Sequence, residues 1–133
     1  MILVDTNVLL DIVTEDPNWK EWSEQQLENA KLIGSVIINP VIYSELSIAF
    51  ARIEEVEAFI SDAPLIVEPI PREALFMAAK SFLKYRRRDG KKHGILPDFY
   101  IGAHAAVEKC PILTRDVKRF RTNFPTVELI TPP

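Results

Sequence analysis

The sequence predicts an α/β fold of three layers, in which helices cover both faces of a central, mostly parallel sheet of about five strands. Short runs of branched apolar residues, the pattern of buried strands, alternate from end to end with longer segments of helical periodicity. Parallel neighbours need such crossover segments between them. The chain has 133 residues, of which 47% are hydrophobic, and shows no linker or repeat. We therefore expect residues 1–133 to form a single domain.

The expected strands are short and are separated by polar or proline-containing breaks. They are Ile2–Val4, Val36–Ile38, Leu65–Val67, Pro111–Thr114 and Val127–Ile130. The first strand is followed at once by Asp5, Thr6 and Asn7, which are residue types that cap helices. Asp5 is therefore expected where a strand ends and a helix begins, at the edge of a parallel sheet where ligands bind.

The helical segments are bounded by proline, glycine and other turn residues. We expect helices at Val8–Val13, Trp19–Leu32, Val41–Ala51, Ile53–Ser61, Arg72–Arg88 and Asp98–Lys109, and a helical turn at Asp116–Phe120. Residues Asp89–Gly94 form a loop in this prediction. Small side chains at Gly102, Ala103, Ala105 and Ala106 favour close packing of the sixth helix on a neighbour.

Composition argues against several classes of protein. The apolar N-terminus lacks a basic leader and is interrupted by Asp5 and Asn7, which is not the pattern of a secretory signal. No apolar run reaches the length of a membrane span. Cys110 is the only cysteine, so no intramolecular disulfide can form, and we expect it to be a small buried residue. These features favour a cytoplasmic protein without membrane association.

The basic residues are concentrated, although the formal net charge is −3. One cluster, called here the basic segment, consists of Arg86, Arg87, Arg88, Lys91 and Lys92, and a second group of basic residues lies between Arg115 and Arg121. Two interpretations of the basic segment stay open. It can be a solvated helix end, where cations interact favourably with the helix dipole. It can also bind the phosphates of a nucleic acid.

Four carboxylates have settings that are unusual for structural residues. Asp5 follows the first strand, Asp98 begins a helix rich in small residues, and Asp116 follows the strand core Ile112–Leu113. Glu45 lies within a helix whose residues three and four positions away are apolar. A glutamate on an apolar face is costly unless it is paired or bound to a cation. Alternatively, each aspartate can be a helix N-cap, and Glu45 can reach solvent at the border of that face.

If these side chains meet, they form an all-oxygen site, which favours a hard cation such as Mg²⁺ or Mn²⁺. Asn7 and Thr114 could add neutral oxygens. Parallel topology brings Asp5 and Asp116 to one edge of the sheet, but the pattern alone does not place Asp98 there. No cysteine–histidine cluster suggests a softer metal, and His104, about on the other side of the helix from Asp98, is expected to be structural.

Four stretches, in order, resemble the PIN domain family. They are VDTNVLL (Val4–Leu10), YSEL (Tyr43–Leu46), LPDFYIGAHA (Leu96–Ala105) and LTRDVKRF (Leu113–Phe120). The similarity spans nearly the whole chain, and the nearest type is the VapC toxin ribonuclease of type II toxin–antitoxin pairs. It implies a PIN-like three-layer fold with the acids gathered at the carboxyl edge of the sheet, Asp98 among them.

The resemblance also implies an activity. It implies that the catalytic residues, which bind the metal, are Asp5, Glu45, Asp98 and Asp116. Asn7 and Thr114 are then supporting polar residues of the site. It implies a Mg²⁺- or Mn²⁺-dependent endoribonuclease that hydrolyses RNA phosphodiester bonds, forms a homodimer and is blocked by a small antitoxin protein. The family pattern does not fix the basic segment, whose contact with RNA is a hypothesis.

The residues leave one alternative to this activity open and disfavour another. One is a PIN-like module that binds RNA or protein without cleaving it. The other is a hydrolase of the haloacid dehalogenase type, which is disfavoured because it needs a second aspartate where this chain has Asn7.

Overall fold

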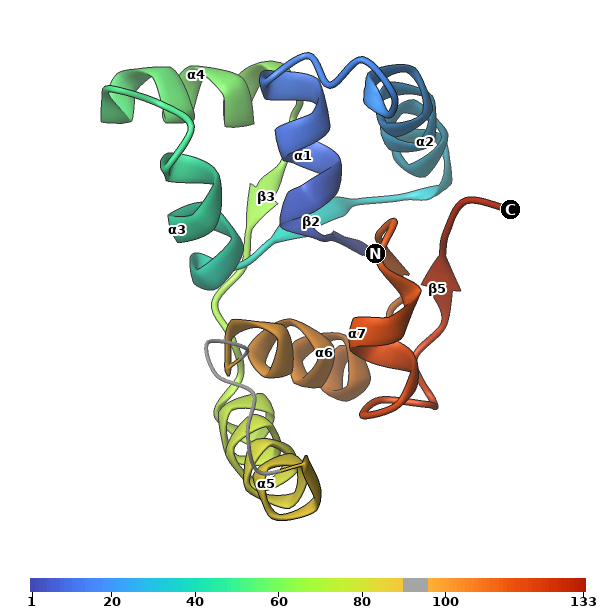
Figure 1. Cartoon of the computed structure of the whole chain (residues 1–133). Coiled ribbons are helices and arrows are strands. Elements are labelled where there is room, and N and C mark those ends of the chain that lie inside the picture. The colour runs from blue at the N-terminus through green and yellow to red at the C-terminus, as the bar shows by residue number, and fades with distance from the viewer. Residues whose placement is uncertain (90–95) are drawn as a thin grey trace.

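The computed structural model describes residues 1–89 and 96–133, which contain an entirely parallel five-stranded sheet (Figure 1). The strands are β1 (Ile2–Val4), β2 (Val36–Ile38), β3 (Ile66–Val67), β4 (Ile112–Leu113) and β5 (Leu129–Ile130), in the spatial order β3-β2-β1-β4-β5. β1 is central, with Ile2 opposite Val36 and Val4 opposite Leu113. Because every pair is parallel, the carboxyl ends of all five strands lie at one edge.

Helices cover both faces of the sheet, which confirms the predicted three-layer α/β/α fold. α1 (Thr6–Val13), α2 (Lys20–Ile33), α3 (Pro40–Ser47) and α4 (Ile53–Asp62) lie on one side in Figure 1, and α6 (Leu96–Glu108) and α7 (Val117–Arg121) lie on the other. α5 (Arg72–Asp89) packs on the outer side of α6. Among the described residues, no helix is both long and apolar enough to cross a membrane.

The third helix is shorter than predicted. α3 ends at Ser47 rather than Ala51, because the next three amides donate to carbonyls three residues back and tighten the chain into turns. Ile48 is consequently 86% exposed instead of packing beside Glu45. The prediction that Glu45 lies on an apolar face is therefore wrong for the residues that follow it. It holds for Ile42 on the preceding turn, which is fully buried.

The sixth helix begins earlier than predicted. α6 starts at Leu96, with Pro97 in its first turn, where the missing proline N–H costs nothing. Asp98 therefore lies inside the first turn of α6 and is not its N-cap. The remaining predicted elements are confirmed with small changes in their bounds, except that most of the predicted loop Asp89–Gly94 lies outside the described residues.

Two hydrophobic clusters form the core. The larger one surrounds β1, β2 and β4, and includes the buried free thiol of Cys110, as predicted. The second lies between α5 and α6 and centres on Phe99, with Tyr85 and Phe124 packed against its ring. Gly102 makes the second cluster possible, because a Cβ atom at this position would overlap the Phe124 ring.

We expect Gly102→Ala to lower the free energy of unfolding by about 1–3 kcal/mol, the usual cost of overpacking. Phe124 is only 5% exposed and packs at 5.9 Å between ring centroids on Phe99, so its ring has no room to move aside. Gly34→Ala is the matched control, because a Cβ atom there would lie 3.5 Å from its nearest neighbour. Urea denaturation of both variants measures the difference, and equal losses would contradict this account of Gly102.

Candidate functional site

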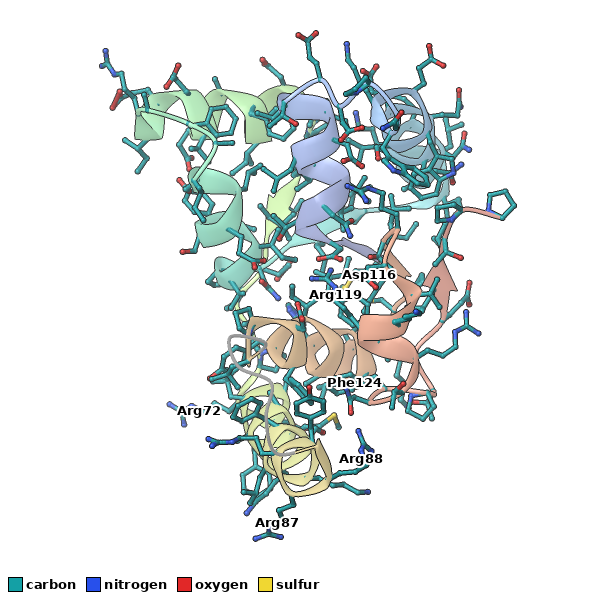
Figure 2. The ribbon with its side chains drawn as sticks, viewed as in Figure 1. Arg72, Arg87, Arg88, Asp116, Arg119 and Phe124 are labelled. Carbon is teal, nitrogen blue, oxygen red and sulfur yellow. The ribbon has the colours of Figure 1, made fainter. Side chains whose placement is uncertain are left out.

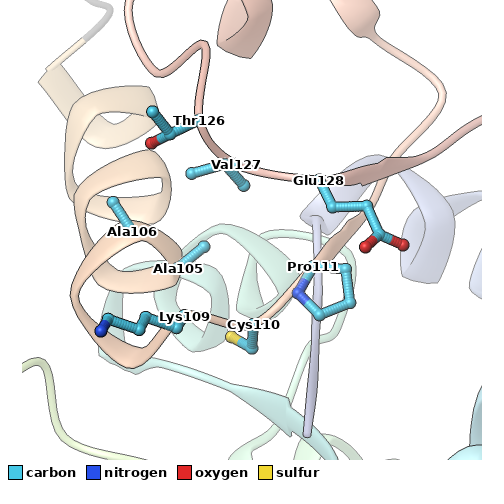
Figure 3. A pocket seen from close by; sticks show the side chains of 8 residues that line it. All are labelled: Ala105, Ala106, Lys109, Cys110, Pro111, Thr126, Val127 and Glu128. Carbon is cyan, nitrogen blue, oxygen red and sulfur yellow. The ribbon is translucent and has the colours of Figure 1, made fainter.

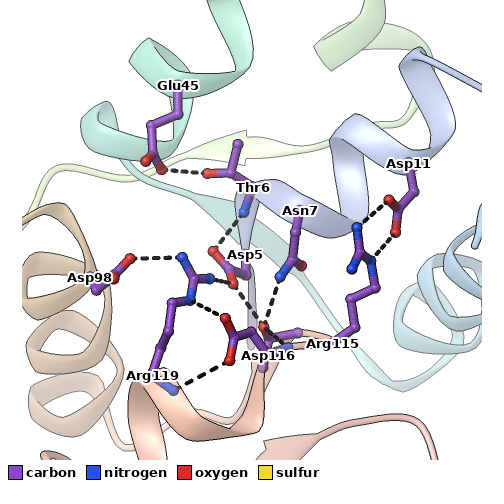
Figure 4. A network of polar contacts seen from close by, with 10 residues as sticks. Asp5, Thr6, Asn7, Asp11, Glu45, Asp98, Arg115, Asp116 and Arg119 are labelled. Carbon is purple, nitrogen blue, oxygen red and sulfur yellow. Dashed lines mark hydrogen bonds and ion pairs between the residues drawn. The ribbon is translucent and has the colours of Figure 1, made fainter. Parts of the chain in front are cut away.

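Asp5 is a fully buried carboxylate at the carboxyl end of the central strand (Figure 4). Its Oδ1 accepts a hydrogen bond from the backbone N–H of Thr6 at 2.8 Å, which caps α1. Its Oδ2 accepts from the Thr114 hydroxyl at 2.7 Å, across the β1–β4 pair. Asp5 is therefore a helix cap with one oxygen, while the other faces the edge of the sheet.

Three of the predicted acids meet around one arginine, Arg119 (Figure 4). The Nη2 atom of Arg119 contacts Oδ2 of Asp5. Its Nη1 atom donates to Oδ1 of Asp98 at 2.8 Å, and its Nε atom lies 3.3 Å from Oδ2 of Asp116. The structure thus brings Asp5, Asp98 and Asp116 together from β1, α6 and the start of α7. The packing of α6 against α7 supplies the approach of Asp98 that the sequence pattern could not give.

Glu45 lies beside this group without touching Arg119. Its Oε1 accepts from the hydroxyl of Thr6, the residue directly after Asp5, at 2.6 Å. Glu45 and Arg119 both line an open groove of about 500 Å³, whose other lining residues are Thr6, Asn7, Leu10, Thr14, Ile48 and Ala49. Glu45 is therefore accessible from a groove that Arg119 also lines.

Thr114 and Asn7 complete the polar group. Thr114 Oγ1 donates to Asp5 and accepts from the backbone N–H of Asp116 at 3.0 Å. The Asn7 side-chain amide donates to the same oxygen at 3.4 Å, and its Oδ1 is a buried acceptor without a hydrogen-bond partner. An unpaired buried acceptor is costly, and a cation or its water would satisfy this one.

The donor set fits a hard divalent cation, since it consists of four carboxylates and one unpartnered amide oxygen. As the described side chains stand, no three carboxylate, imidazole or thiol groups converge closely enough to hold a metal ion. The Arg119 guanidinium lies between them instead. Its role was missed in the sequence, although its spacing of three from Asp116 on a helix is the signal of an ion pair.

Arg115 anchors the loop that carries Thr114 and Asp116. Its guanidinium forms a bidentate ion pair with Asp11, at 2.7 and 2.9 Å, and lies 5.1 Å from a Trp19 ring centroid. Asp11 is 2% exposed and also accepts from Ser23 on α2 at 2.7 Å. This network ties the end of β4 to α1 and α2, a link that no sequence pattern indicated.

A buried Asn39–His104 pair connects the helices that carry Glu45 and Asp98. Oδ1 of Asn39 caps α3 by accepting from the Ile42 N–H at 3.0 Å, so its amide nitrogen faces His104 Nδ1 at 3.1 Å as the donor. His104 is therefore neutral, with its proton on Nε2, and burial lowers its pKa. The structural role expected for His104 is confirmed.

A second pocket carries none of these residues (Figure 3). It has a volume of about 360 Å³ and is lined by Ala105, Ala106, Lys109, Cys110, Pro111, Thr126, Val127 and Glu128. Because Pro111 precedes β4, the pocket lies at the amino edge of the parallel sheet, opposite the acidic group. This pocket is therefore separate from the acidic group.

Comparison with known proteins assigns the fold to a family. A model of the PIN domain matches residues 2–124. The chain belongs to the PIN domain family. No curated protein sequence matches it significantly.

Several solved structures share the PIN fold of this chain. VapBC2 from Rickettsia felis, bound to a DNA fragment from its promoter, has a TM-score of 0.76 and 18% identity, covering 100% of both chains. FitAcB from Neisseria gonorrhoeae has a TM-score of 0.69 and 23% identity, covering 99% of this chain and 98% of that one. DNA-bound VapBC from Salmonella typhimurium has a TM-score of 0.71 and 17% identity, covering 98% and 96%. At these identities the likeness establishes the fold alone.

Within this PIN domain, Asp98 is the carboxylate of the acidic edge whose pKa is clearly shifted. Burial raises the pKa of its carboxyl to about 6. The charge of Arg119 opposes the shift, whereas those of Asp5, Glu45 and Asp116 add to it. Desolvation is therefore the main cause of the raised pKa, and the three neighbouring acids enlarge the shift.

We expect Asp98→Asn to raise the free energy of unfolding of the metal-free PIN domain by about 1–3 kcal/mol at about pH 7.5. Because the folded-state pKa is raised, the stabilisation from protonating Asp98 is complete below the unfolded pKa and is lost as pH rises through about 6. Asparagine resembles the protonated carboxyl, so the gain should shrink towards about pH 4.

Denaturation in a chelating buffer at both pH values measures this difference. Asp62→Asn, at an exposed position on α4, is the matched control and should change stability by less than about 0.5 kcal/mol at either pH. A gain for Asp98→Asn that did not depend on pH would show that burial of its charge is not the cause.

Proposed function

We propose that this PIN domain is a metal-dependent endoribonuclease and the toxin of a type II toxin–antitoxin pair. The observation that carries the proposal is the meeting of Asp5, Asp98 and Asp116, with Glu45 beside them, at the carboxyl edge of the sheet. Family membership supports a hydrolase, and several structures of the same fold are toxin–antitoxin or VapBC complexes. The single domain over residues 1–133 and a cytoplasmic location belong to the same proposal.

Mg²⁺ or Mn²⁺ would be held by Asp5, Asp98 and Asp116, with Glu45 as a further ligand or partner of its water. Such an ion would neutralise charge on the phosphate and would lower the pKa of a bound water molecule. Thr114 holds Asp5 and Asn7 in place, and the unpartnered Oδ1 of Asn7 is available to orient a water molecule. Hydrolysis adds water to the scissile phosphate and breaks its bond to the 3′ oxygen.

RNA contact is proposed for the basic segment. Arg86, Arg87 and Arg88 end α5, on the far side of α6 from Arg119 (Figure 2), whereas Lys91 and Lys92 lie outside the described residues. Arg88 donates to Asn123 at 3.2 Å, and Arg86 lies 5.9 Å from the Phe82 ring centroid. The exposed guanidinium groups at this helix end support binding to phosphates over several nucleotides.

The proposed partners are an RNA substrate, a small antitoxin protein and a second copy of the chain in a homodimer. The antitoxin is supported by the complexes that share the fold, three of which are described as bound to DNA. A non-catalytic PIN-like module is the second candidate, favoured by one observation: Arg119 occupies the centre of the acidic group. Cleavage assays separate the two.

We expect the purified protein to cut RNA internally when Mn²⁺ or Mg²⁺ is added, and to be inactive with a chelator. Asp98→Asn should lower the cleavage rate at least about 100-fold, since it removes a charged ligand from the metal site. Asp62→Asn makes the same chemical change on the exposed surface and should retain the wild-type rate.

Sequencing the 5′ ends of total RNA after incubation measures cleavage. Wild-type activity in Asp98→Asn would refute the proposed site. Binding of RNA by the wild type with no metal-dependent cleavage would favour the non-catalytic module.

We expect Arg86→Gln/Arg87→Gln to weaken RNA binding and to flatten its salt dependence by about 1.4 in the log–log slope, about 0.7 for each lost phosphate contact. Affinity for a single-stranded RNA in chelating buffer, at several salt concentrations, measures the slope. Arg52→Gln/Arg72→Gln removes two exposed arginines distant from this helix end and is the control. If the salt dependence had the same slope in both double variants, the basic segment would be a solvated helix end and not an RNA contact.

A further inference from the structure

Arg119 forms ion pairs with three acids that come from three different elements. Each nitrogen of its guanidinium faces another carboxylate: Nη2 faces Asp5, Nη1 faces Asp98 and Nε faces Asp116. The side chain is 29% exposed, while the Asp5 side chain is fully buried and that of Asp98 is 15% exposed. The arginine side chain is thus partly exposed, while its guanidinium group lies among the carboxylates.

The proposed metal ion would be held by the same carboxylates. Oδ2 of Asp5 and Oδ1 of Asp98 are the atoms that the arginine contacts, and they are also the oxygens aimed at the centre of the site. A guanidinium and a metal ion at one set of oxygens repel each other as like charges. The two cations therefore exclude each other from this position.

We propose that Arg119 is an internal cation that closes the acidic site of the metal-free protein, and that a divalent metal ion binds only by displacing it. This rests on the proposed metal site. The groove of about 500 Å³ that Arg119 lines gives the displaced side chain a place to go, with Glu45 on its wall. Displacement needs no movement of the sheet, because Arg119 lies on the short helix α7 at the rim.

The exchange has a defined effect on metal affinity. The apparent dissociation constant equals the intrinsic constant divided by the fraction of molecules whose site is open. Ion pairs to three carboxylates keep that fraction small, so removal of the guanidinium should tighten metal binding. The same removal leaves the carboxylates unpaired in the metal-free protein, which should lower its melting temperature until metal is added.

Calorimetric titration with Mn²⁺ of the wild type, Arg119→Gln and Arg121→Gln tests the proposal. Arg121 is exposed on the same helix, so its replacement makes the same change in net charge away from the acids. We expect Arg119→Gln to bind Mn²⁺ at least about tenfold more tightly than the wild type, and Arg121→Gln to stay within about twofold. The rise in melting temperature on adding Mn²⁺ should also be largest for Arg119→Gln.

A measurement on the wild type covers the case in which Arg119→Gln does not fold. The Nε–Hε resonance of Arg119, assigned with Arg119→Lys, should shift to the position of a solvated arginine as Mg²⁺ is added. Equal affinity of wild type and Arg119→Gln, or an unchanged resonance at saturating Mg²⁺, would overturn the proposal while the metal site stands. Failure of every variant to bind Mn²⁺ would overturn the metal site and this inference together.

Discussion

The buried carboxylate of Asp5 is the interaction on which the rest of the site depends. An ionised carboxylate removed from water is strongly unfavourable unless hydrogen bonds and opposite charge compensate for it. Here the backbone of Thr6, the hydroxyl of Thr114 and the guanidinium of Arg119 provide that compensation. They belong to α1, the end of β4 and α7, so Asp5 can be buried only when the parallel pairing of β1 with β4 is in register.

The sequence was sufficient for the sheet and for one part of the site. Branched apolar runs predict the strands, and parallel topology then places the residues that follow them at one edge. Because Val4 pairs with Leu113, Asp5 and Thr114 become neighbours, and Asp116 follows two residues later. The position of Asp98 could not be obtained in this way, since α6 follows no strand. It depends on how α6 packs on its neighbours, and Gly102 contributes by leaving room for the Phe124 ring.

Side-chain partners were the least predictable feature. The sequence places Arg115 and Arg119 in a basic group, yet each forms an ion pair with a buried aspartate. Their spacing along the chain permits this, but only the positions of α1 and α6 relative to α7 decide it. The early end of α3 has a different cause, because backbone hydrogen bonds to carbonyls three residues back replace the longer helix that the apolar pattern predicts.

Arg115 and Arg119 have different roles in the charge balance at the acidic edge. Arg115 is neutralised by Asp11 and serves the architecture of the loop, so it contributes little to the four carboxylates beyond it. Arg119 alone faces Asp5, Asp98 and Asp116, with Glu45 close by. One positive charge cannot balance four negative ones. Burial is the main cause of the raised pKa of Asp98, and the charges of Asp5, Glu45 and Asp116 add to that rise. A site built in this way stays attractive to a doubly charged cation even while an arginine fills it, which is the condition that an exchange of the two cations requires.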